Sequence, residues 1–149
     1  MSDWPPHATV ATVVERDGRS RSVEERDKTS GEMVFNQPAG HLERGESLMD
    51  AAYRETLEET RWEIGLTAVL GISLYQAPNG KTYLRTTFLA TPEREQATRD
   101  LDPDISAVHW MSYEELLAQS GKMRSPLVLA AIEQHRKGIC YPLDLIYGP

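Results

Sequence analysis

The sequence predicts an α/β fold of the mixed α+β kind, in which a mixed β-sheet lies between helices as an α/β/α sandwich. Strand-like segments stand on both sides of one long helical segment, so the order is not a repeating βα unit. That helix carries apolar residues on two sides, which indicates that it is covered on both. With 149 residues and a hydrophobic fraction of 40%, the chain suits one domain spanning residues 1–149.

The first part of the chain reads as short strands that lead into the helix. Residues 19–24 are polar for a strand, but they follow the hairpin signal Asp17-Gly18. The helix itself begins near Ser47, a suitable N-cap residue. The expected elements before it are strands at residues 9–14, 19–24 and 33–36 and a Pro-Ala-Gly turn at residues 38–40.

The second part of the chain predicts a hairpin, a further strand and two helices. Ser112 with Glu115 forms a capping box, and Ser125 with Pro126 opens a second helix that ends before Gly138. The apolar tail at residues 141–149 is expected to dock on the body. The other expected elements are strands at residues 66–75, 83–90 and 105–111, a turn at residues 78–80 and a loop at residues 92–103.

Composition excludes several classes of partner. The formal net charge of -7 argues against bulk nucleic-acid binding, which needs a basic face. Cys140 is the one cysteine, and the N-terminus has neither a basic segment nor an apolar one. No apolar run is long enough to span a membrane. We expect a cytoplasmic protein without a membrane partner, and both a monomer and a homodimer remain open.

Three glutamates share one face of the long helix. The stripe begins with Leu48 and Ala51 and then becomes Glu55 and Glu59, with Glu58 beside them. A solvated acidic face, with Arg54 pairing Glu58, is one interpretation. The other is a partly buried site, because the stripe starts apolar and the glycine-bearing turn PAGHLERGE runs into the helix.

Carboxylates at a partly buried site need a compensating cation. Ligands that are all oxygens favour Mg²⁺, with Mn²⁺ as a second candidate, over Zn²⁺. Such an ion activates water and offsets charge on a leaving phosphate. The residues therefore favour metal-assisted hydrolysis of a phosphate ester or anhydride, with a small phosphorylated molecule as substrate.

The segment GHLERGESLMDAAYRETLEETRW at residues 40–62 resembles the Nudix box, G-x5-E-x7-R-E-U-x-E-E-x-G-U, where U is a bulky apolar residue. Two positions depart from that pattern. Thr56 replaces an apolar residue, and Arg61 replaces a glycine that lets the chain turn. Arg61 is expected to extend the helix, adopt a strained conformation or interact with the helix C-terminus. The matching positions are Gly40, Glu46, Arg54, Glu55, Glu58, Glu59 and Trp62.

The resemblance continues beyond the box and implies the Nudix fold and a hydrolase. The segments NQPAGHLE, RSPLV and YPLD are similar to a bacterial subgroup of small Nudix phosphatases. That similarity implies Mg²⁺-dependent release of phosphate from nucleoside tri- and diphosphates or from hydroxymethylpyrimidine and thiamine pyrophosphates. Pro78 leaves open an ADP-ribose-type pyrophosphatase. Arg61 leaves open a non-catalytic module that senses a nucleotide or binds a partner.

The resemblance also implies roles for the residues of the box. Glu55, Glu58 and Glu59 are expected to bind the metal, with the backbone carbonyl of Ala39 as an additional ligand. Arg54 is expected to orient Glu46 and Glu58, and Gly40 and Glu46 are structural positions of the motif. The general base is expected to be Glu55 or Asp104, and the alternative for Asp104 is a capping aspartate.

Candidate substrate contacts lie outside the helix. Arg85, in the middle of a strand, either pairs with a carboxylate or holds a phosphate in the pocket. Tyr75 and Trp62 either stack on a substrate ring or pack in the core. Gln37 and His41 flank the turn before the helix and are candidates for contact with the substrate, and the alternative for His41 is a loop histidine with satisfied hydrogen bonds.

Overall fold

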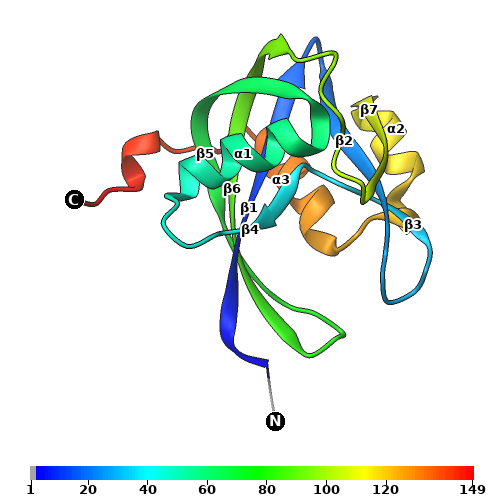
Figure 1. The fold of residues 1–149 in the computed structure, drawn as a ribbon, viewed down its shortest axis with the longest axis horizontal. Helices are drawn as coiled ribbons and strands as arrows, with labels where there is room; N and C mark the ends of the chain where they lie inside the picture. The colour runs from blue at the N-terminus through cyan, green and yellow to red at the C-terminus, as the bar shows by residue number, and fades with distance from the viewer. Residues whose placement is uncertain (1–2) are drawn as a thin grey trace.

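The computed structural model describes residues 3–149 and shows a twisted sheet with one helix on one face and the other helices on the opposite face (Figure 1). The predicted mixed α+β fold is confirmed. The elements are β1 (Asp3–Arg16), β2 (Arg19–Arg26), β3 (Met33–Asn36), β4 (Ala39–His41), α1 (Leu48–Thr60), β5 (Trp62–Gln76), β6 (Lys81–Glu95), β7 (Ile105–Ser112), α2 (Tyr113–Ala118), α3 (Pro126–Arg136), and the 3-10 turns η1 (Ser120–Lys122) and η2 (Leu143–Leu145).

The strands pair in one mixed sheet of the order β3-β2-β1-β6-β5, with β4 added to β1 and β7 added to β2. The long central strand β1 runs parallel to β6 and antiparallel to β2 and β4. Antiparallel β5 and β6 form the hairpin that closes at Gly80, where φ is +85°. The parallel pairing of β1 with β6 makes the sheet mixed, as expected.

Alternation along β1 divides the core into two layers. Val10 and Val14 face α1 and pack with its Ala51 and Ala52. Val13 points the other way, into a second cluster that contains residues of α2 and α3. Because neighbouring strand residues point to opposite faces, one strand contributes to both layers of the sandwich.

Helix α1 begins with a complete capping box. The Ser47 hydroxyl accepts a hydrogen bond from the Asp50 amide, and the Asp50 side chain accepts one from the Ser47 amide. The helix ends at Thr60 because Arg61 adopts the left-handed conformation, with φ of +67°. Trp62 is therefore the first residue of β5.

Several element boundaries differ from those predicted, and two of them bear on the site. Residues 39–41, predicted as part of a turn, form the short strand β4, because their backbone pairs with β1 at Thr9 to Ala11. Strand β6 continues to Glu95, into the segment predicted as a loop, because β5 starts early enough to pair with it. The polar return strand is confirmed as β2, which buries Ser20 and Ser22 between β1, β3 and β7.

The C-terminal tail docks on the body as expected. The Tyr141 backbone exchanges two hydrogen bonds with Val69 on the edge strand β5, each at 2.8 Å. Leu143 and Ile146 pack against the core cluster on the α1 side of the sheet, and a short 3-10 turn replaces the expected extended conformation. Within residues 3–149, none of the helices combines the length and the apolar character that crossing a membrane requires.

Candidate active site

The end of α1 and the short strand β4 meet through a hydrogen bond between the backbone and a buried carboxylate. The Ala39 amide donates to Glu59 Oε1 at 2.9 Å, and Glu59 is only 8% exposed. Strand β4 is fixed in turn by its pairing with β1. The sheet thus places the backbone of residues 39 and 40 against the glutamate face of α1.

Gly40 makes this close approach possible. A Cβ atom built on Gly40 would fall within the volume of the Glu55 carboxylate. Glu55 therefore lies directly against the β4 backbone, and its side chain is 13% exposed. The glycine is required for space rather than for an unusual backbone angle, because its φ does not lie in the left-handed region.

Arg54 organises the acidic side chains around it. Its Nε and one terminal nitrogen donate to the two oxygens of Glu46, at 2.6 and 2.9 Å, and that terminal nitrogen also donates to the His41 carbonyl. The other terminal nitrogen donates to Glu55 at 2.7 Å and lies 3.6 Å from Glu58. The Arg54 guanidinium therefore makes two hydrogen bonds to Glu46 and one to Glu55, whereas Glu58 is only a more distant ion-pair partner.

Burial changes the protonation of the site. Desolvation raises the pKa of Glu59 to about 9, against the opposing effect of the Ala39 amide. Desolvation also raises the pKa of Glu55, with the Arg54 hydrogen bond opposing it. Glu46 behaves differently, because its hydrogen bonds with Arg54 lower its pKa to about 2. The charged forms of Glu55 and Glu59 are thus poorly compensated by the protein alone, whereas the charged form of Glu46 is well compensated.

These side chains do not form a preformed metal-binding site. Among residues 3–149, no three His, Cys, Asp or Glu side chains converge closely enough to hold an ion as they stand. Arg54 and the Ala39 amide occupy oxygens of Glu55 and Glu59. The donor set nevertheless fits a hard divalent cation, because it offers carboxylate oxygens in a partly buried place where the pKa of Glu59 signals uncompensated charge.

A pocket of ≈ 360 Å³ opens beside the glutamate face. The short strand β4 belongs to both, because Ala39, Gly40 and His41 line the pocket. Tyr75 and Tyr83, a cross-strand pair of the β5–β6 hairpin, line it as well. Of the predicted substrate residues, the structure therefore brings His41, Tyr75 and Arg85 together in one cavity.

Arg85 lies in the pocket and is almost completely buried, with 7% exposed. One terminal nitrogen donates to Gln37 at 2.7 Å and to Asn36 at 3.3 Å, while Nε has no partner. Among the described residues it has no carboxylate partner within 4.0 Å, so the pairing predicted as one alternative does not occur. Desolvation lowers its pKa to about 10.

Two predicted substrate contacts lie elsewhere. Gln37 is buried behind Arg85, where it accepts from that guanidinium and donates to the Val128 carbonyl, and it does not line the pocket. Trp62 packs edge-on against Trp110 at 6.1 Å, beneath the Arg16 guanidinium. Trp62 therefore packs against another aromatic side chain, and Gln37 positions Arg85.

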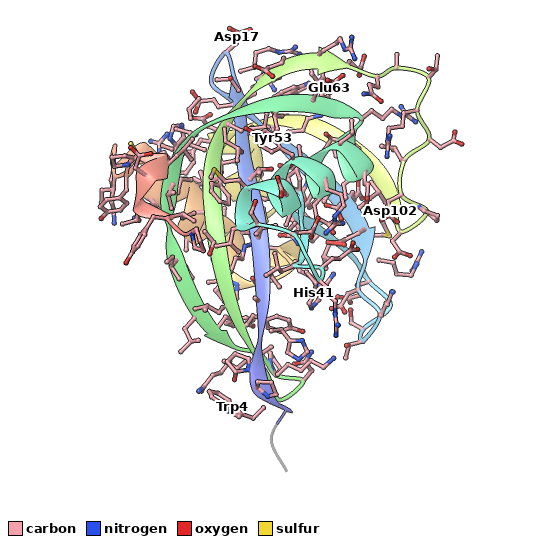
Figure 2. All side chains as sticks on the ribbon, turned by 60° about the vertical axis from the view of Figure 1, so that its left-hand side comes forward. Trp4, Asp17, His41, Tyr53, Glu63 and Asp102 are labelled. Carbon is pink, nitrogen blue, oxygen red and sulfur yellow. The ribbon has the colours of Figure 1, made fainter. Side chains whose placement is uncertain are left out.

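The loop before β7 approaches the site through Asp102 rather than through the predicted Asp104. The Asp102 amide donates to the Glu58 carbonyl at 2.9 Å, and its charge contributes to raising the pKa values of Glu55 and Glu59. Asp104 is exposed and faces Lys28 at 3.7 Å. Figure 2 shows Asp102 beside α1, with His41 on the same side of the molecule. The Asp102 side chain accepts a hydrogen bond from the Asp104 amide. This turn determines which residue of the loop lies next to α1.

Glu25, Tyr83 and Arg124 are among the pocket residues that were not predicted from the sequence. Arg124 begins the segment RSPLV, and its role was not evident without the fold. The pairing of Tyr83 with Tyr75 follows from hairpin register, which was a usable signal. Glu25 comes from β2, whose pairing with the next strand β3 places it beside Asn36.

The two departures from the box have structural explanations. Thr56 shares a buried hydrogen bond of 2.8 Å with Thr12 on β1, so the hydroxyl is satisfied where an apolar side chain is usual. Arg61 adopts the strained conformation expected as one alternative, with φ of +67°, and its amide donates to the Leu57 carbonyl. The turn after the helix is therefore formed without glycine.

Comparisons with known proteins show the family of this chain. The NUDIX domain family model matches residues 5–131. Proteins named Phosphatase NudJ from Escherichia coli strain K12 and from Shigella flexneri are each 40% identical over 143 residues, which cover 96% of this chain and 92% of theirs. A solved NUDIX hydrolase from Nitrosomonas europaea is 39% identical, covers 97% of this chain and 98% of its own, and superposes with a TM-score of 0.94.

A more distant structure shares the fold alone. The MutT NUDIX hydrolase from Burkholderia pseudomallei is 22% identical, with a TM-score of 0.72 over 87% of this chain and 98% of its own. The family model covers most of the chain, including the whole box on β4 and α1. The protein described here belongs to the Nudix hydrolase family.

Proposed function

We propose that this Nudix hydrolase cleaves a phosphoanhydride bond of a small phosphorylated molecule with the help of Mg²⁺ or Mn²⁺. The substrate class is a nucleoside tri- or diphosphate or a related pyrophosphate, such as hydroxymethylpyrimidine or thiamine pyrophosphate. The buried Glu59 carboxylate beside the β4 backbone carries the proposal, because it lacks a compensating cation. The similarity to proteins named Phosphatase NudJ supports release of phosphate.

We infer a role for each acidic side chain from these contacts. Glu55, Glu58 and Glu59, with the Ala39 carbonyl, would hold the divalent cation. When bound, the cation lowers the pKa of water and offsets charge on phosphate oxygens. Arg54 keeps Glu55 in place and is itself fixed by Glu46. Asp102 adds a fourth carboxylate near the end of α1.

A proton must leave the attacking water, and Glu55 is the better of the two predicted bases. Its carboxylate lies against Gly40 at the pocket wall, and burial raises its pKa. Asp104 is exposed and faces Lys28. Glu55 would therefore accept the proton, and Arg54 would hold its carboxylate toward β4.

The pocket would bind the part of the substrate that carries the phosphates. Arg85 would donate to an anionic or carbonyl oxygen, and Tyr75 with Tyr83 would contact a ring. His41 lines the entrance next to β4. Gln37 would hold Arg85 from behind rather than touch the substrate.

Product analysis distinguishes the candidate reactions. The protein is incubated with Mg²⁺ and nucleoside tri- and diphosphates, hydroxymethylpyrimidine and thiamine pyrophosphates, and ADP-ribose, and all products are separated. Orthophosphate from a terminal group supports the proposal, whereas AMP with ribose phosphate supports the ADP-ribose alternative. Pro78 lines the pocket but also belongs to the turn closed by the Gly80 amide and the Ala77 carbonyl. Saturable binding without turnover of any compound would support the non-catalytic alternative.

We also propose that residues 1–149 fold as one domain and that the enzyme is cytoplasmic. The continuous sheet, which joins β1 to β6 and β2 to β7, supports a single unit. The exposed thiol of Cys140 suits a reducing compartment. A monomer and a homodimer both remain compatible with this proposal.

A further inference from the structure

Two guanidinium groups line the same pocket from different elements. Arg85 projects from β6, and Arg124 comes from the segment just before α3. Their charges lie close enough for Arg124 to lower the pKa of Arg85. Arg85 is 7% exposed and its Nε has no hydrogen-bond partner, so an unsatisfied donor group lies buried at the pocket wall. A buried unpaired donor costs free energy that a bound acceptor removes.

The N-terminus of α3 opens into the same place. Ser125 is the N-cap residue, Pro126 is the first helical residue, and both Ser125 and Leu127 are near or at the pocket wall. Pro126 has no amide hydrogen, and the Leu127 amide donates to the Ser125 hydroxyl, so the helix contributes the positive end of its dipole, which favours an anion, rather than free amide donors. Two arginines and a helix N-terminus thus point to one kind of ligand, an anion.

Glu25 is the counter-ion of this group in the absence of ligand. Its carboxylate lies 3.4 Å from the Arg124 guanidinium and accepts a hydrogen bond from Asn36 at 3.3 Å. It lines the pocket, and its side chain is 15% exposed. Glu25 also has an attractive interaction with Arg85 across the cavity. An incoming anion would therefore compete with Glu25 for Arg124.

We propose that Arg85, Arg124 and the N-terminus of α3 form a phosphate-binding site that works without the metal, and that Glu25 limits its affinity by competing for Arg124. This inference rests on the proposed function, because it assigns a second phosphate subsite to the same pocket. The substrate then carries at least two phosphates. One is held at the glutamates and its neighbour at the arginines, on the two sides of β4.

Arg124 and Glu25 are specificity-determining residues in this arrangement. Removing Arg124 weakens phosphate binding, whereas neutralising Glu25 frees Arg124 and strengthens it. Arg124→Gln lowers the net charge and Glu25→Gln raises it, so opposite signs would also follow from a general effect of net charge, and a charge-matched variant remote from the pocket is needed to separate the two explanations. The surface-exposed Arg136, at the far end of α3, provides a charge-matched control.

The test is an NMR titration of the metal-free protein with inorganic phosphate in the presence of EDTA. In the wild type, backbone amides at the start of α3 and the Nε–H of Arg85 should shift saturably. Arg124→Gln should weaken binding by about three- to tenfold, and Glu25→Gln should strengthen it by a similar factor. Arg136→Gln should bind phosphate like the wild type.

Several results would overturn the inference. They are absence of saturable binding in both the wild type and Glu25→Gln, unchanged affinity in Arg124→Gln, and equal weakening in Arg136→Gln. The spectra also report whether each variant is folded. Turnover with Mg²⁺ is measured separately on the wild type, so an enzyme that hydrolyses its substrate but does not bind phosphate in EDTA refutes only the second site. Phosphate binding without any turnover refutes only the proposed function.

Discussion

The amide of Ala39 donates a hydrogen bond of 2.9 Å to the buried carboxylate of Glu59, and this contact joins the sheet to the glutamate face of α1. The neighbouring Gly40 leaves the space that the Glu55 carboxylate occupies. Both contacts place glutamate carboxylates against β4, and β4 also lines the pocket.

Glu59→Gln should abolish turnover and at the same time stabilise the metal-free protein. Glutamine has nearly the same shape and still accepts from the Ala39 amide, but it removes a buried acid that lacks a compensating cation. Thermal unfolding in EDTA at neutral pH measures the gain in stability. Each kcal/mol should raise the melting temperature by roughly 2–4 °C. Added Mg²⁺ should raise the melting temperature of the wild type and not of the variant. A variant that is less stable in EDTA would contradict this.

Gly40→Ala should reduce kcat/KM by about 100-fold or more while leaving the fold intact. The added methyl group would occupy the volume of the Glu55 carboxylate and displace it from β4. Gly121→Ala is the matched control, because a Cβ there meets no atom within 4 Å. Steady-state kinetics and circular dichroism check both variants. Wild-type activity in Gly40→Ala would mean that Glu55 is not required in this position.

Arg61→Gly should be more stable than Arg61→Ala by about 1 kcal/mol. Both variants remove the guanidinium, so the comparison isolates the backbone conformation, whose φ of +67° favours glycine. Urea unfolding measures the difference. Equal stability of the two variants would show that the turn relaxes when the arginine is removed.

Thr56→Val should cost about 1–3 kcal/mol, because it leaves the buried Thr12 hydroxyl without a partner. The double variant Thr12→Val with Thr56→Val should recover most of that loss, since no unpaired hydroxyl remains. A double-mutant cycle by urea unfolding tests the coupling. Strictly additive losses would show that the two hydroxyls act independently.

Glu46 should make the protein sensitive to acid. Its pKa is lowered to about 2 by Arg54, so its stabilising effect is complete above the unfolded value near 4.5 and is lost as the pH falls toward 2. Glu46→Gln should remove that part of the pH dependence. The measurement is the stability of both proteins against unfolding as a function of pH, from about pH 6 to about pH 2. Parallel curves would refute the role of this ion pair.

Much of the site could be predicted because its signals are local. The capping residues and the spacing of the glutamates within residues 47–60 depend on a single helix, and both are seen in α1. Arg85 and Tyr75 lie in the pocket because strand alternation turns both toward one face.

The failures concern contacts between distant segments. Strand β4 has only three residues, and its extended form depends on pairing with β1. Asp102 rather than Asp104 approaches α1 because a backbone hydrogen bond to the Glu58 carbonyl sets the loop. Gln37 is buried because Arg85 and the Val128 carbonyl use its side chain. None of these partners is close in sequence, so local patterns did not reveal them.

The central claim is that the buried Glu59 carboxylate supports a metal-dependent cleavage of a phosphoanhydride bond. The most direct measurement is phosphate release from nucleoside and pyrimidine pyrophosphates as a function of Mg²⁺ concentration, for the wild type and Glu59→Gln in parallel. We predict saturable Mg²⁺-dependent release by the wild type and none by the folded variant. Equal release by both proteins, or release by the wild type that persists in EDTA, would contradict the account.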